Sequence, residues 1–87
     1  MAQIIEIYVE NKTYQIEWAL SEYFDELKGK KFILNEMAAD QIETINDLSS
    51  TAKILLSAVA GAVIQHLIDN NCQIDKIFET GFFLVKE

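Results

Sequence analysis

An uncharged run of eleven residues, Ile54–Ile64 (ILLSAVAGAVI), is the feature that most constrains the fold of this 87-residue chain. The run lies inside a helical pattern that we predict over residues 51–69. Ser49 or Ser50 supplies an N-cap, and the pair Asn70-Asn71 ends the helix. How the rest of the chain covers this helix decides the architecture.

The predicted helix is apolar on two sides. One wide face carries large side chains: Leu55, Leu56, Val59, Val63 and Leu67. The other side combines isoleucines with small residues that let another backbone approach closely: Ile54, Ala58, Gly61, Ile64 and Ile68. A helix that is apolar on nearly every side is normally buried on nearly every side.

A chain of this length buries only roughly 60–65% of its unfolded surface, so it has little material to cover both sides. We expect the first side to pack on a sheet, and the second to meet a copy of the chain in a homodimer, or another partner. The alternative is a central helix enclosed by the chain's own hairpin and helices. The uncharged run is far shorter than the ~20 apolar residues that cross a bilayer, so we expect no membrane span.

Residues 3–18 predict a β-hairpin. A two-residue turn at Asn11-Lys12 gathers six large apolar side chains on one face, pairing Val9 with Tyr14, Ile7 with Ile16 and Ile5 with Trp18. The opposite face then carries Glu6 across from Glu17, with Glu10 nearer the turn. This face is either solvated or a contact for a partner.

Two shorter helices are expected between the hairpin and the long helix. Residues 19–28 show helical spacing that stops at Gly29, and Lys30–Leu34 form a third strand or an extended linker. A second helix over residues 36–47 follows Asn35 as its cap. Its outer side carries one continuous acidic ridge: Glu36, Asp40, Glu43 and Asp47.

The C-terminal residues 72–87 predict a strand, a turn at Thr80-Gly81 and a second strand. The chain is therefore expected to form a single domain, residues 1–87, of the α+β class. Its antiparallel sheet is built from N-terminal and C-terminal β-hairpins. About three helices pack on one face, with the long third helix in the centre.

Charge narrows the range of partners. Fourteen carboxylates face seven lysines, there is no arginine, and the net charge is −7. This balance argues against direct contact with nucleic acid or with an anionic membrane, and favours a basic protein surface. The alternative is that acidity only keeps the protein soluble. The segment MAQIIEIYVE lacks the basic start of a signal peptide, so we expect a cytoplasmic protein.

Catalytic chemistry has little support in the sequence. His66 and Cys72 are the only residues of their kinds, and a packed histidine and a buried thiol are the favoured interpretation of the pair. Zinc needs more cysteine or histidine, and no loop of alternating oxygen ligands suits calcium. No phosphate-binding glycine motif is present. We expect no enzyme activity, no metal and no cofactor.

The resulting hypothesis is a small acidic binding protein that inhibits a partner by occupying its basic groove, for example on a nucleic-acid-binding protein. Seven residues would make the contact: Glu36, Asp40, Glu43, Asp47, Glu6, Glu10 and Glu17. Phage anti-defence proteins of the anti-CRISPR kind and toxin-immunity proteins are analogies of size and charge. The alternative is a homodimeric structural or adaptor subunit that uses the apolar third helix.

Overall fold

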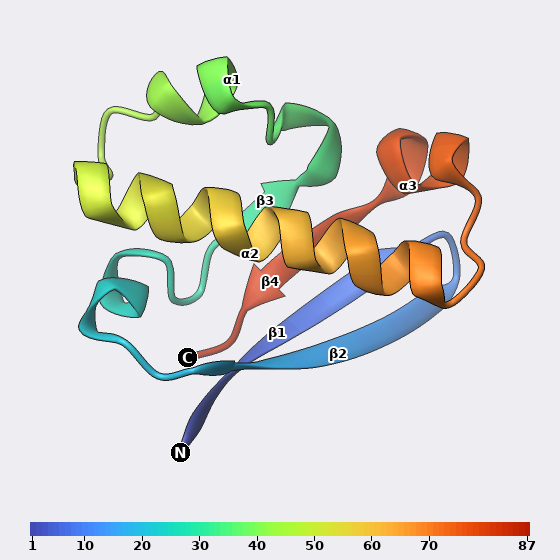
Figure 1. Ribbon diagram of the computed structural model, residues 1–87, viewed down its shortest axis with the longest axis horizontal. Coiled ribbons are helices and arrows are strands. Elements are labelled where there is room, and N and C mark those ends of the chain that lie inside the picture. The colour runs from blue at the N-terminus through green and yellow to red at the C-terminus, as the bar shows by residue number, and fades with distance from the viewer.

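The computed structural model describes residues 1–87 as a four-stranded antiparallel sheet with helices on one side (Figure 1). The strands are β1 (Ala2–Val9), β2 (Lys12–Ala19), β3 (Lys31–Ile33) and β4 (Phe82–Val85), in the order β2-β1-β4-β3. The helices are η1 (Glu22–Glu26), η2 (Leu34–Glu36), α1 (Ala39–Glu43), α2 (Ser50–Asp69) and α3 (Ile74–Thr80). The predicted α+β class, with an antiparallel sheet and a long helix, is confirmed.

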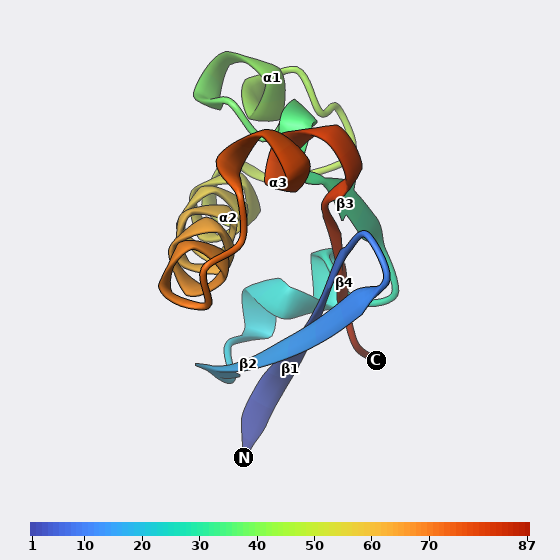
Figure 2. The ribbon, with the colours of Figure 1, turned by 90° about the vertical axis from the view of Figure 1, so that its right-hand side faces the viewer.

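Helix α2 forms the second layer of the molecule. It crosses the sheet, with α1 and α3 beside it, and the end-on view separates it from the strands (Figures 1 and 2). Four of the five residues predicted on the inner face, Leu56, Val59, Val63 and Leu67, are fully buried, whereas Leu55 is only half-buried. The predicted caps are also confirmed: the Ser49 hydroxyl accepts a hydrogen bond from Ala52 N–H at 3.2 Å, and Asn70 ends the helix.

The molecule is thin, with extents of 32 × 31 × 18 Å. The short dimension corresponds to one helical layer and one sheet layer. Each layer therefore keeps one face that no other element covers: the outer side of α2 and the outer side of the sheet.

The N-terminal hairpin forms, but its predicted turn is wrong. Glu10 and Asn11 make the turn, Val9 pairs with Lys12, and Ile5 pairs with Ile16. The register differs from the predicted one by two residues, which preserves the facing of every side chain because the side-chain period of a strand is two. The predicted opposition of Glu6 and Glu17 is also wrong, since Gln15 lies across from Glu6 and Ile4 lies across from Glu17.

The predicted C-terminal hairpin is wrong in its first half. Residues 74–80 form helix α3, and only β4 is a strand, inserted between β1 and β3. Burial of Ile77 favours the helix, because α3 places this side chain in the hydrophobic core, where it is fully buried. Gly81 then leaves the helix with its N–H bonded to the Ile77 carbonyl oxygen at 2.8 Å, and its own carbonyl oxygen accepts from Leu34 N–H at 3.0 Å.

The segment before α2 is less helical than predicted. Residues 22–26 form a 3-10 helix with Ser21 as its N-cap, and the expected helix over 36–47 is interrupted after Glu36. Burial of Leu34 beside Gly81 holds η2 to the end of α3, so the chain turns at Met37-Ala38 before α1 begins. Lys31–Ile33 are the third strand, which resolves the choice between strand and linker.

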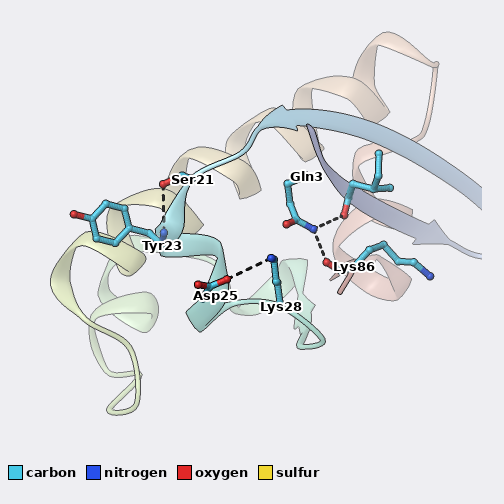
Figure 3. Close-up of polar contacts among 7 residues, drawn as sticks. Gln3, Ser21, Tyr23, Asp25, Lys28 and Lys86 are labelled. Carbon is cyan, nitrogen blue, oxygen red and sulfur yellow. Dashed lines mark hydrogen bonds and ion pairs between the residues drawn. The ribbon is translucent and has the colours of Figure 1, made fainter. Parts of the chain in front are cut away.

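Polar contacts secure the start of β1 and the two ends of η1 (Figure 3). Gln3 is the one buried polar residue, and its side-chain amide donates to the backbone carbonyl oxygens of Lys86 and Ile4. The Ser21 hydroxyl accepts from Tyr23 N–H at 3.3 Å, and Lys28 pairs with Asp25 at 3.3 Å. The Gln3 contact fastens the residues after β4 to the start of β1.

Candidate protein-binding surfaces

The outer side of α2 is an exposed, largely apolar surface, which we call the α2 face and define by Ile54, Ala58, Gly61, Ile64 and Ile68. Ile54 is 71% exposed and Ile68 40%, although both belong to the helix whose other side forms the core. Ala58 and Gly61 are exposed between them, and a Cβ added at Gly61 would meet nothing within 4 Å. Ile64 is half-buried and packs against the core.

A groove of about 490 Å³ lies between α1 and the first half of α2, next to Ile54. Ile42 lies along its base, Lys53 and Glu43 line it, and Ser57 joins it to the α2 face. The Lys53 ammonium donates to the backbone carbonyl oxygen of Glu43 at 2.8 Å, which leaves the Glu43 carboxylate exposed. Sequence reasoning missed this groove, because its walls come from two helices whose packing no local pattern specifies.

The predicted acidic ridge does not exist as one helical surface. Asp40 and Glu43 lie on α1, whereas Glu36 belongs to η2 and Asp47 to the loop before α2. Asp47 pairs with Lys30 at 2.9 Å, and this hydrogen bond and charge lower the pKa of its carboxyl. Glu36, Asp40 and Glu43 are exposed without a lysine partner.

The acidic residues of the hairpin lie on the other side of the molecule. Glu6 points to the outer side of the sheet, accepts a hydrogen bond from the Tyr8 hydroxyl at 2.9 Å and lies 3.6 Å from the Lys86 ammonium. The same hydrogen bond raises the pKa of Tyr8. Glu17 is exposed on β2, and Glu10 occupies the turn. The seven candidate carboxylates therefore belong to two separate surfaces.

The outer side of the sheet also carries an aromatic cluster that the sequence did not indicate. Tyr8 stacks on Phe82 with ring centroids 4.9 Å apart, and the Lys31 ammonium lies 4.2 Å from the centre of the Phe82 ring. Ile33 beside them is 41% exposed. The Lys31 ammonium over the Phe82 ring makes a cation–π contact, so this cluster already has an interaction partner within the chain.

His66 and Cys72 do come close to one side chain, Tyr14 of β2. The Tyr14 hydroxyl lies 3.1 Å from Cys72 Sγ, and the rings of Tyr14 and His66 meet edge to face with centroids 6.1 Å apart. The hydrogen bond with Cys72 and burial raise the pKa of Tyr14. No three His, Cys, Asp or Glu side chains converge as a metal site would require. The contacts join β2 to the end of α2.

Comparison with protein-family models, with curated proteins and with solved structures finds no match to this chain. By length and composition alone, the 20-residue helix α2 also meets the minimum for a membrane-crossing helix, a test that core helices of soluble proteins pass as well. Its inner side is packed on the sheet in this fold.

Proposed function

We propose that this chain is a non-enzymatic protein-binding domain that uses the α2 face as its contact surface. The supporting observation is the 71% exposure of Ile54 on a helix whose opposite side is fully buried. A large apolar side chain in that position is costly to leave in water and contributes when a partner covers it.

The shape of the surface favours a helix as the partner. Ser57, Ala58 and Gly61 form a shallow strip between Ile54 and Ile68, and a second helix can approach closely over such small residues. Glu43 lines the groove at one end of this strip, and the exposed Asp40 lies on the same short helix, α1. A partner helix with an apolar stripe and a lysine or arginine near one end complements both features.

Inhibition of a basic protein is the second candidate, and one observation favours it. Three of the four carboxylates predicted on the second helix have no lysine partner in the chain, and the net charge is −7. In this version Asp40 and Glu43 carry the binding and the α2 face supplements it. Anti-defence and immunity proteins of phages and bacteria remain analogies of size and charge.

Selection from a displayed library of 20-residue peptides, followed by affinity measurement on variants, separates the candidates. If the α2 face binds, Ile54→Glu and Gly61→Leu weaken the selected peptides by roughly 30-fold, the loss typical of a central interface residue. Asp40→Lys with Glu43→Lys has a smaller effect, which shrinks further at high salt. Glu87→Lys, an exposed change after β4 and outside both the α2 face and α1, is the control of equal charge change.

Unchanged affinity for Ile54→Glu and Gly61→Leu contradicts the use of the α2 face. A collapse of affinity confined to the Asp40 and Glu43 reversal supports the basic-groove inhibitor instead.

A further inference from the structure

We propose that β2 pairs edge to edge with β2 of a second copy, so that two four-stranded sheets join into one sheet of eight strands. Strand β2 ends the sheet and has β1 as its only neighbour. This surface is distinct from the α2 face, and it involves main-chain groups rather than an apolar helix.

The alternation of main-chain hydrogen bonds identifies which groups face the free edge. Lys86 N–H donates to the Ile4 carbonyl oxygen at 3.0 Å, so the even-numbered residues of β1 direct their main-chain groups toward β4. The odd-numbered residues then bond to their partners in β2, which are residues 12, 14, 16 and 18. The main chain of Thr13, Gln15 and Glu17 therefore points outward, with no strand to receive it.

Strand β2 lacks the length limit, bulge and proline that usually block pairing at an exposed edge. The strand is eight residues long, pairs with β1 without a bulge and contains no proline. Natural proteins usually protect exposed edges with short strands, bulges, prolines or charges. The charged residues of β2 are Lys12 and Glu17, whose charges sum to zero, whereas the whole chain has a net charge of −7. Two copies therefore meet less electrostatic repulsion at β2 than the net charge of the chain implies.

The inward side chains favour a second copy as the occupant. Ile5 and Ile7 of β1 are fully buried, whereas Tyr14, Ile16 and Trp18 of β2 are only half-buried on the same face. They lie at the margin of the layer that α2 covers. An antiparallel second β2 places the same three side chains alongside, which extends the apolar face across the joint.

Register restricts the pairing further. The inward side chains of both copies lie on the same face only if the two-fold axis that relates the copies passes through a residue of β2. A shift of one residue would place inward side chains opposite outward ones. An axis at Gln15 places Thr13 opposite the partner's Glu17, and an axis at Ile16 places Gln15 opposite the partner's Glu17. Both registers put a polar donor against that carboxylate, whereas an axis at Glu17 opposes two carboxylates and is disfavoured.

The test measures mass and the fluorescence of Trp18, the only tryptophan, over a range of concentrations. We expect light scattering to report twice 9.9 kDa at high concentration, with a blue-shifted Trp18 emission that reverts on dilution. Gln15→Pro removes an N–H that points to the free edge and spares the bonds to β1, so it should give a folded monomer.

A second variant keeps the test decisive if Gln15→Pro fails to fold. Gln15→Glu opposes like charges in both registers and should weaken association at least tenfold at low salt, with Gln41→Glu on α1 as the control of equal charge. A mass of 9.9 kDa at every concentration up to about millimolar overturns the proposal. So does a dimer that survives Gln15→Glu and is lost in Ile54→Glu, which would assign self-association to the α2 face.

Discussion

Ser49 donates two hydrogen bonds to the carboxylate of Glu26, from its backbone N–H to Oε1 at 2.8 Å and from its hydroxyl to Oε2 at 2.7 Å. The same hydroxyl oxygen accepts from Ala52 N–H, so the N-cap of α2 is tied to η1 through one side chain. Both hydrogen bonds lower the pKa of Glu26 below its ordinary value of 4.5.

The first prediction concerns acid stability. Because the folded state lowers the pKa of Glu26, its contribution to stability is present above pH 4.5 and is lost as the pH falls through the folded-state pKa. Glu26→Gln should lower the unfolding midpoint at neutral pH and flatten its decline in acid. Urea unfolding at a series of pH values measures both. Glu22→Gln, an exposed change in the same short helix, should leave the curve intact, and parallel curves for wild type and Glu26→Gln would contradict the assignment.

The second prediction compares two glycines. A Cβ at Gly81 would overlap the Ile77 carbonyl oxygen and lie 2.8 Å from Leu34 Cδ1, so Gly81→Ala should cost roughly 1–3 kcal/mol through overpacking. A Cβ at Gly61 meets open space on a helix, so Gly61→Ala should raise the free energy of unfolding by about 0.5–1 kcal/mol. Thermal or urea unfolding measures both. Equal effects would show that the close approach at Gly81 is not maintained in solution.

The third prediction concerns the hairpin turn. Glu10 has φ 55°, a left-handed conformation that costs an ordinary residue about 1–2 kcal/mol and glycine very little. Its N–H donates to the Thr80 hydroxyl at 3.0 Å, a bond that glycine retains. Glu10→Gly should therefore raise the free energy of unfolding by about 0.5–1 kcal/mol. Glu10→Gln removes the charge and keeps the strain, so a gain equal to that of Glu10→Gly would attribute the effect to charge.

The strongest periodicities in the sequence predicted the structure well. The two sides of α2 separate as the spacing of Leu56, Val59 and Val63 requires, and the hairpin places Ile5 and Ile7 in the core. The turn was misplaced because it depends on a tertiary contact. Local preference favours Asn11 as the first residue of the turn. In the structure Glu10 takes that position, where its N–H donates to the hydroxyl of Thr80, 70 residues further along the chain.

The predictions of a strand before Thr80-Gly81 and of a continuous acidic ridge were wrong for the same reason. Ile74, Ile77 and Phe78 have helical spacing, but seven residues are too few for propensity to decide against a strand, and the buried position of Ile77 makes the choice. The acidic ridge required an unbroken helix over 36–47. Packing of Leu34 against the Gly81 region breaks that helix, which no local pattern between Asn35 and Asp47 reveals.

The insertion of β4 between β1 and β3 has a consequence for biosynthesis. Tyr8 pairs with Phe82, which the ribosome adds more than seventy residues later, so the sheet cannot close until that further length of chain has been made. Until then the nascent hairpin exposes one apolar side, and its open edge on β1 accepts any extended segment nearby. The yield of correctly folded protein therefore depends on how soon β4 becomes available to β1, or on a chaperone that protects the hairpin until then.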